Sequence, residues 1–195
     1  MIQLSNSYYL HIPKTAGTFI RRVLKEASLF ESEIGHSHDK AFDYRPNTFT
    51  FVRLPDSWIQ SLWSDWNRNH TARNSNKIGI RKGIWSYKTF SPVMLDIVKP
   101  KLNDTVECLI NKYPGFISQM YKEYTANCNM VGKQENLRND LITILTTYDD
   151  ISDDTINTIK RYPKQNVNGT KEKIDSTLLK ELLNSESYIM DKWYG

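Results

Sequence analysis

The chain has 195 residues, of which 39% are hydrophobic and 25% charged, and its formal net charge is +4. These values are typical of a soluble protein with one globular domain, and the charge is too small to indicate bulk nucleic-acid binding. No apolar run approaches the roughly 20 residues that span a membrane, and the first residues lack the pattern of a signal peptide. Two cysteines without a CxxC pair indicate neither a disulfide framework nor a zinc site. We therefore expect a cytoplasmic protein.

The first unit along the chain is a strand, a turn and a helix. Residues 8–12 are apolar and read as a short strand, and an amphipathic helix begins near residue 18. The turn between them presents free backbone N–H groups, to which the helix dipole adds about half a positive charge. Lys14 places an ammonium group at the same point. On this stretch alone, the pattern is equally compatible with an anion-binding turn and with an ordinary connection whose lysine is exposed.

A second unit of the same kind follows. Residues 48–52 (TFTFV) read as a buried strand, Arg53 follows at its end, and Pro55 stands near the first turn of a helix. The apolar face of that helix is marked by Trp58, Ile59, Leu62, Trp63 and Trp66. Two such units predict an α/β fold with a central parallel sheet flanked by helices. Both turns should open on one edge of the sheet, where ligands usually bind.

The rest of the chain predicts more helices within a single domain that covers residues 1–195. Residues 67–101 are irregular, first basic and then aromatic, and we interpret them as an insertion that binds the acceptor or closes over the site. Asp104 and Glu107 form an aspartate variant of a capping box, which predicts a helix start at residue 104. Ser152 is predicted as an N-cap, and the C-terminal helix is expected to kink near Ser185.

The familiar nucleotide-binding motifs do not fit the first turn. A Walker A loop has the pattern GxxxxGK[ST], but here Lys14 precedes Gly17 and no GK[ST] occurs anywhere in the chain. The dinucleotide pattern GxGxxG is also absent. The turn therefore has the composition of a phosphate-binding loop of a different kind.

Residues 11–18 (HIPKTAGT) closely resemble the 5′-phosphosulfate loop of the sulfotransferases that use 3′-phosphoadenosine 5′-phosphosulfate (PAPS). Residues 49–55 (FTFVRLP), with Ser61 eight positions after Arg53, resemble the 3′-phosphate motif of that family, although Leu54 stands where the family usually has asparagine. The similarity continues at residues 114–116, 131–137, 140–141 and 168–171 and in the aromatic C-terminal helix. The chain looks most like the small bacterial-type, carbohydrate-like members, which implies a three-layer sandwich similar to that of P-loop NTPases.

The resemblance implies a role for each matching residue. The phosphosulfate would be held by Pro13, Lys14, Thr15, Ala16, Gly17, Thr18 and Phe19. Arg53 and Ser61 would bind the 3′-phosphate, and a late loop with Thr170 and Lys171 would close over the nucleotide. Lys14 would assist catalysis by stabilising charge on the oxygen that leaves sulfur.

The reaction implied is transfer of a sulfuryl group to a hydroxyl or amine, with a small molecule or carbohydrate as acceptor and no metal. His36 matches the histidine that relatives carry between the two motifs and is the candidate general base; His38 is the alternative, whereas His11 reads as structural. Two other functions remain compatible with the sequence. They are a kinase of the P-loop type that uses ATP and magnesium, and a catalytically inactive module that binds a nucleotide or glycan.

Overall fold

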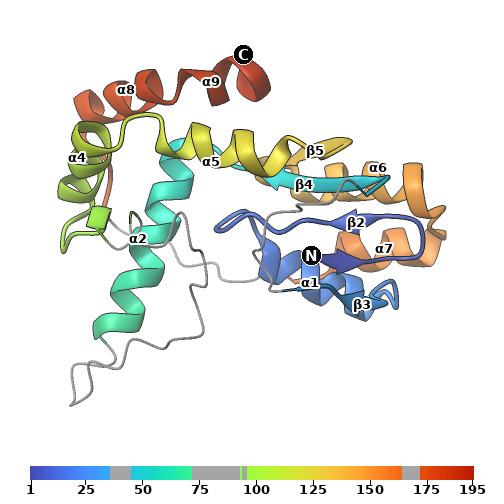
Figure 1. Ribbon diagram of the computed structural model, residues 1–195. Coiled ribbons are helices and arrows are strands. Elements are labelled where there is room, and N and C mark those ends of the chain that lie inside the picture. Colours follow the sequence, from blue (N-terminus) through green and yellow to red (C-terminus); the bar gives the residue numbers. More distant parts are fainter. Residues whose placement is uncertain (36–44, 72–92, 94–95, 164–171) are drawn as a thin grey trace. The chain divides into compact units, whose positions relative to one another are not determined.

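The computed structural model describes residues 1–35, 45–71, 93, 96–163 and 172–195, with the side chains of residues 68–71 excepted. The chain divides into two compact units, each built from two segments. The first unit is Met1–Arg53 with Tyr121–Val167, and the second is Leu54–Met120 with Asn168–Gly195 (Figure 1). Most of the insertion expected over residues 67–101 lies outside the described residues, and its proposed role stays a prediction.

A five-stranded sheet forms the centre of the first unit. Its strands are β1 (Ile2–Gln3), β2 (Tyr8–Tyr9), β3 (Ser32–Glu33), β4 (Thr48–Val52) and β5 (Met130–Lys133). They lie in the order β3-β1-β2-β4-β5. Strands β2, β4 and β5 are parallel, whereas β1 is antiparallel to both β2 and β3. The α/β class is thus confirmed, and the sheet is mixed because a short hairpin adds an antiparallel strand beyond β2.

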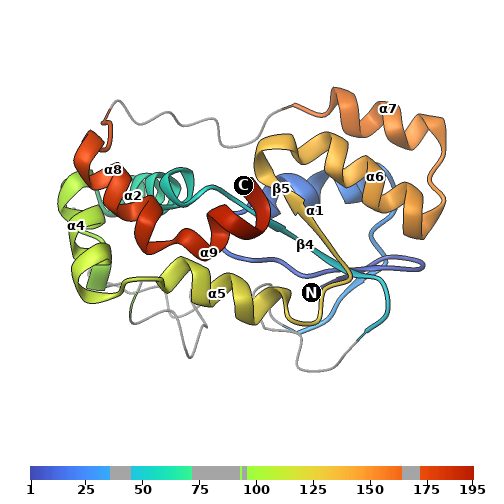
Figure 2. The ribbon, with the colours of Figure 1, turned by 90° about the horizontal axis from the view of Figure 1, so that it is seen from above.

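Three helices cover one face of this sheet: α1 (Gly17–Glu26), α6 (Leu137–Asp149) and α7 (Asp153–Arg161). Figure 2 shows them gathered on one side of β2 and β4. Their apolar faces and the strands form a single core, whose members include Tyr9, Phe19, Ile20, Val23, Leu24, Phe49, Phe51, Leu141, Ile144, Leu145 and Ile159. The amphipathic helix predicted after the first turn is therefore confirmed, with its apolar side chains buried on one face.

The start of α7 also agrees with the sequence. The Ser152 hydroxyl accepts a hydrogen bond from the Thr155 N–H at 3.3 Å, which is the bond expected of an N-cap. Two acidic residues in the first turn and two basic residues in the last complement the helix dipole. The local sequence therefore predicts the start of this helix.

The parallel pairing of β2 with β4 brings the ends of these two strands together. Tyr9 lies opposite Phe49, and just beyond β2 the Leu10 N–H donates to the Phe49 carbonyl at 2.9 Å. The Thr50 hydroxyl returns a bond to the Leu10 carbonyl at 2.6 Å. Residues 13–16 and Arg53 therefore follow neighbouring parallel strands at the same edge of the sheet, as the sequence predicted.

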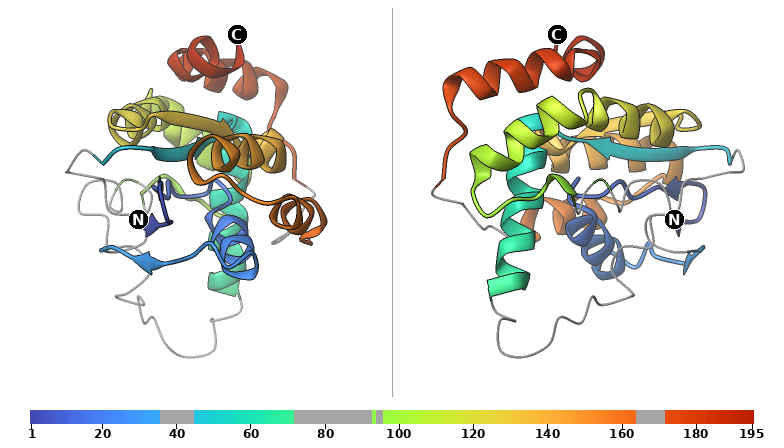
Figure 3. Two further views of the ribbon diagram at one scale, coloured as in Figure 1. Left: turned by 90° about the vertical axis from the view of Figure 1, so that its right-hand side faces the viewer. Right: turned by 60° about the vertical axis from the view of Figure 1, so that its left-hand side comes forward.

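The second unit is helical over its described residues. It contains α2 (Pro55–Thr71), α4 (Leu102–Lys112), α8 (Ser176–Ser185), α9 (Ser187–Ile189) and η2 (Met190–Tyr194), together with the beginning of α5 (Phe116–Thr125). Helices α2, α4 and α8 contact one another in pairs. The predicted C-terminal helix is interrupted after Ser185, as expected from the sequence, and α9 and the π-helical turn η2 carry the chain to its end (Figure 3).

Helix α4 begins two residues before the predicted position, so the expected capping box at Asp104 is wrong. Its N-cap is Lys101, which makes no side-chain capping bond. The Leu102 N–H instead donates to the carboxylate of Glu172, 70 positions later in the chain, at 3.0 Å. A distant side chain thus satisfies this helix end, and a search for capping residues within the local sequence could not find it.

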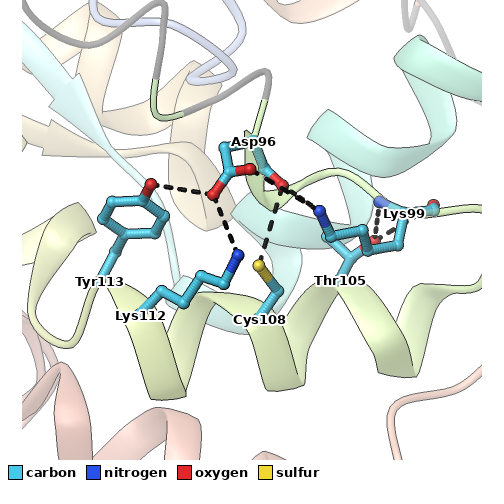
Figure 4. A network of polar contacts seen from close by, with 6 residues as sticks. All are labelled: Asp96, Lys99, Thr105, Cys108, Lys112 and Tyr113. Atoms are coloured by element: carbon cyan, nitrogen blue, oxygen red, sulfur yellow. Dashed lines mark hydrogen bonds and ion pairs between the residues drawn. The ribbon is translucent and has the colours of Figure 1, made fainter.

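A polar network fixes the segment before α4 to one side of that helix (Figure 4). The Asp96 carboxylate accepts a hydrogen bond from the Tyr113 hydroxyl at 2.9 Å and lies 3.5 Å from the Lys112 ammonium. The Tyr113 bond and the nearby lysine charges lower the pKa of Asp96 below its ordinary value. The Thr105 hydroxyl accepts from the Lys99 N–H at 2.8 Å. These contacts hold residues 96–99 against α4.

Glu186 explains the interruption of the C-terminal helix. Its carboxylate is fully buried and accepts the Ile117 N–H at 3.1 Å and the Ser118 N–H at 2.7 Å, two of the unsatisfied donors at the start of α5. Burial raises the pKa of Glu186, and the bonds from Ser118 and Ile117 oppose that rise. The helix thus breaks where a buried glutamate turns inward to cap another helix.

No helix among the described residues is long and apolar enough to cross a membrane.

Candidate functional site

The turn after β2 has an unusual backbone. Lys14 and Ala16 adopt φ angles of 65° and 69°, the left-handed region that residues with a side chain seldom occupy. Ala16 is the residue before α1, and its side chain makes no capping bond. Left-handed residues in a short turn direct successive N–H groups toward one concave side, which is the geometry of an anion-binding nest. Two such residues indicate a turn that is held in shape by its contacts.

The first turn of α1 leaves N–H groups for a ligand. Phe19 and Ile20 donate to the Ala16 carbonyl at 2.9 and 3.1 Å. The N–H groups of Gly17 and Thr18, in contrast, have no hydrogen-bond partner among the residues that the structure describes. The first turn of α1 also contains no acidic residue. This helix start can therefore accept an anion through the backbone of Gly17 and Thr18, whereas the N–H of Phe19 is already used.

The two threonines of the turn have different surroundings. Thr15 is fully buried, and its hydroxyl donates to the Ile12 carbonyl at 2.8 Å, three residues earlier. Thr18 is exposed on the first turn of α1. Thr15 therefore shapes the turn from inside, and Thr18 is the threonine whose hydroxyl can reach a bound molecule.

Gly17 is required by a close contact within the protein. A Cβ atom at this position would lie 1.9 Å from Nε2 of His11, far inside van der Waals contact. His11 itself stacks on the ring of Tyr9, with ring centroids 6.0 Å apart. The resemblance implies that Gly17 contacts the phosphosulfate. The structure gives a reason for glycine that involves no ligand, namely the imidazole packed against the start of α1.

Tyr9 contributes a buried hydroxyl beneath α1. Its side chain is fully buried, and its ring packs against the rings of Phe49 and Phe51. Burial raises the pKa of Tyr9 far above its ordinary value, and the positive charge of Arg21 and a hydrogen bond with the Thr15 side chain oppose only part of this rise. The hydroxyl is therefore neutral at any physiological pH.

Arg53 joins the end of β4 to the turn after β2. Its Nη1 donates to the Lys14 carbonyl at 3.2 Å, across 39 positions of sequence. Its backbone is held by Tyr121 of α5, whose hydroxyl accepts the Arg53 N–H at 3.2 Å and donates to the Arg53 carbonyl at 3.1 Å. The structure thus brings together the two cationic turns, one with an ammonium and one with a guanidinium, within the first unit.

A third cation lies beside the start of α1. The Arg138 guanidinium is 5.3 Å from the centre of the Phe19 ring and donates to the carbonyls of Ile159 and Tyr162 at 3.2 and 2.6 Å. Phe19 also packs edge to face with Tyr162, at 5.7 Å between centroids. The predicted ligand residue Phe19 is therefore a packing residue with a buried ring. Neither Arg138 nor Tyr121 has a sequence pattern that would have identified it.

Four predicted residues are not brought to this site by the described structure. Ser61 is half-buried on α2 and belongs to the second unit, so it is not placed against Arg53. His36, Thr170 and Lys171 lie outside the described residues, as does the alternative base His38. Their roles stay predictions. The described part of the candidate site is thus Pro13–Phe19 with Arg53.

Metal ligands and cysteine thiols are further candidates for chemistry in the described part of the chain. Within residues 1–35, 45–67, 93, 96–163 and 172–195, no three side chains of His, Cys, Asp or Glu are grouped closely enough to hold a metal ion. Cys108 is buried on α4. Burial raises the pKa of Cys128 to about 12, and its thiol donates to the Tyr124 carbonyl. Both thiols are therefore packing groups.

Comparison with known proteins gives no relative on which to rest an identification. No protein-family model, curated protein or solved structure matches this chain.

Proposed function

We propose that this chain is a sulfotransferase that transfers a sulfuryl group from PAPS to a hydroxyl or amine. The observation that carries the proposal is the bond from Arg53 to the Lys14 carbonyl, at the carboxyl ends of neighbouring parallel strands. PAPS has a phosphosulfate at one end and a 3′-phosphate at the other, so its binding requires two cationic positions in one site. An ammonium on a nest-like turn and a guanidinium on the next turn supply that combination.

The backbone of the turn supports the assignment of the phosphosulfate end. The N–H groups of Gly17 and Thr18 remain available among the described residues, and the exposed Thr18 hydroxyl adds a donor. All three groups donate hydrogen bonds, so they can contact the oxygens of a tetrahedral oxyanion directly, with no metal ion between them. Lys14 then contributes the positive charge on this turn.

In the proposed reaction the acceptor oxygen or nitrogen forms a bond to sulfur while the bond from sulfur to the bridging oxygen breaks. The electron pair of that bond remains on the 5′-phosphate, which leaves as adenosine 3′,5′-bisphosphate. The Lys14 ammonium stabilises this developing charge, and the proton of the acceptor passes to a base, for which His36 is the proposed residue. The acceptor is proposed to be a small molecule or carbohydrate, and the fold a three-layer sandwich of the P-loop type.

A thermal-shift experiment tests this function. Adenosine 3′,5′-bisphosphate in the presence of EDTA is expected to raise the melting temperature. At 100 times its dissociation constant, a ligand adds about 2.7 kcal/mol to the free energy of unfolding. For a chain of this size that gain corresponds to a shift of roughly 5–10 °C. Stabilisation by ATP with magnesium, and none by the bisphosphate, would instead support a kinase and refute the proposal.

A further inference from the structure

The backbone conformation of Lys14 needs external support. For a residue with a side chain, the left-handed conformation is less stable than the ordinary helical one. Lys14 adopts that conformation with φ at 65°, and its own carbonyl points to the Arg53 guanidinium. A second bond, from the Thr15 hydroxyl to the Ile12 carbonyl, closes the turn from inside. The orientation of the Lys14 peptide group therefore depends on the side chain of Arg53, the residue that follows β4.

Arg53 is itself fixed before any ligand binds. Tyr121 is fully buried and bonds both the N–H and the carbonyl of Arg53, so it sets the direction in which the arginine leaves β4. A guanidinium carries five N–H donors in one rigid plane, so one edge can hold a carbonyl while another edge faces a phosphate. The ammonium of a lysine has no such plane and cannot serve both partners in a fixed geometry.

We propose that Arg53 is a positioning residue for Lys14 in addition to its proposed role as a ligand for the 3′-phosphate. Through the Lys14 carbonyl, Arg53 holds the phosphosulfate turn in its binding conformation. The chain of contacts runs from Tyr121 to Arg53 to Lys14 and couples the two ends of the donor site. This inference rests on the proposed function, which supplies the identity of the two anions.

The test uses a ligand that lacks the 3′-phosphate, namely adenosine 5′-phosphosulfate. If Arg53 contacted only the 3′-phosphate, Arg53→Ala would lower the affinity for adenosine 3′,5′-bisphosphate and leave the affinity for adenosine 5′-phosphosulfate unchanged. The positioning role predicts that Arg53→Ala also lowers the affinity for adenosine 5′-phosphosulfate, by about three- to tenfold, the effect of losing one hydrogen bond. Isothermal titration of both ligands measures the two effects on the same protein preparation.

Two further variants separate positioning from a general loss of charge or of folding. Arg161→Ala removes an equal charge from an exposed position on α7 and should change neither affinity. Tyr121→Phe keeps the Arg53 side chain but removes both hydrogen bonds to the Arg53 backbone. It should therefore also lower the affinity for adenosine 5′-phosphosulfate. If Arg53→Ala does not fold, the Tyr121→Phe titration decides the question in its place.

The outcomes distinguish this inference from the function on which it rests. A wild-type chain that binds neither nucleotide refutes the proposed sulfotransferase. If the wild-type chain binds both nucleotides, the deciding variant is Arg53→Ala, or Tyr121→Phe where Arg53→Ala does not fold. An unchanged affinity of that variant for adenosine 5′-phosphosulfate refutes only the positioning role. Weaker binding of adenosine 5′-phosphosulfate in the deciding variant, with Arg161→Ala unaffected, supports it.

Discussion

Replacement of Lys14 by alanine is expected to slow sulfuryl transfer by about 100- to 1,000-fold, the usual effect of removing one group that stabilises charge in a transition state. The affinity for adenosine 3′,5′-bisphosphate should fall much less. The reason is that the product is also held by backbone N–H groups and by Arg53, whereas the charge on the bridging oxygen develops only during the reaction. Release of the bisphosphate from PAPS measures the rate, and calorimetry measures the affinity.

The choice of variant matters because of the backbone at Lys14. Alanine tolerates the left-handed conformation about as poorly as lysine does, so the strain at this position is unchanged, and the carbonyl that Arg53 contacts is retained. Glycine would relax the turn and mix two effects. Lys14→Met is the matched control, since it keeps most of the side-chain length but no charge, and it should be as slow as Lys14→Ala. Equal losses of affinity and rate in both variants would contradict a role in the transition state.

Gly17→Ala is expected to lower the free energy of unfolding by about 1–3 kcal/mol, the usual cost of forcing an extra group into a packed site. At a helix position with room for a Cβ, the same change would raise the free energy of unfolding by up to about 1 kcal/mol. The sign of the measured change therefore shows whether a steric clash exists at Gly17. The predicted cost comes from the His11 imidazole, which a Cβ would meet at 1.9 Å. Chemical denaturation followed by circular dichroism measures the change.

A double-mutant cycle isolates that contact. In the His11→Ala background the space beside Gly17 is open, and Gly17→Ala should then be neutral or stabilising. A cost for Gly17→Ala that is the same with and without the imidazole would show that the steric explanation is wrong.

Much of the first unit could be predicted because its determinants are local. The apolar spacing of α1, the β-branched run of β4 and the Ser152 cap each lie within a few residues, and all three predictions are confirmed. The shared edge of the two turns followed from these elements, since two strand–helix units imply parallel pairing.

The features that the sequence did not reveal depend on distant contacts. Strands β1 and β3 have two residues each, too few for a period to be visible, and they exist through pairing with each other and with β2. The start of α4 is capped by Glu172. The kink expected near Ser185 is confirmed, but its cause, the capping of α5 by Glu186, could not be seen in the sequence. None of these partners is near its target in the sequence.

In the candidate site, too, the residues that belong to a local motif could be predicted and those that depend on distant contacts could not. The motifs identified Lys14 and Arg53, and in the structure the Arg53 side chain donates a hydrogen bond to the Lys14 carbonyl. The sequence did not distinguish the buried Thr15 from the exposed Thr18, because both have the same side chain in the same motif. Tyr121 was also missed, since an aromatic residue on an apolar helix face is indistinguishable by pattern from any core residue.

The most direct test of a site with two anion-binding positions is a calorimetric titration in EDTA. It compares adenosine 3′,5′-bisphosphate with adenosine 5′-phosphate and adenosine 3′-phosphate. The proposed site predicts one binding event per chain for the bisphosphate and clearly weaker binding of each monophosphate, because each lacks one of the two anions. Equal affinity for the bisphosphate and either monophosphate, or no binding of the bisphosphate, would contradict the proposal that Lys14 and Arg53 serve opposite ends of PAPS.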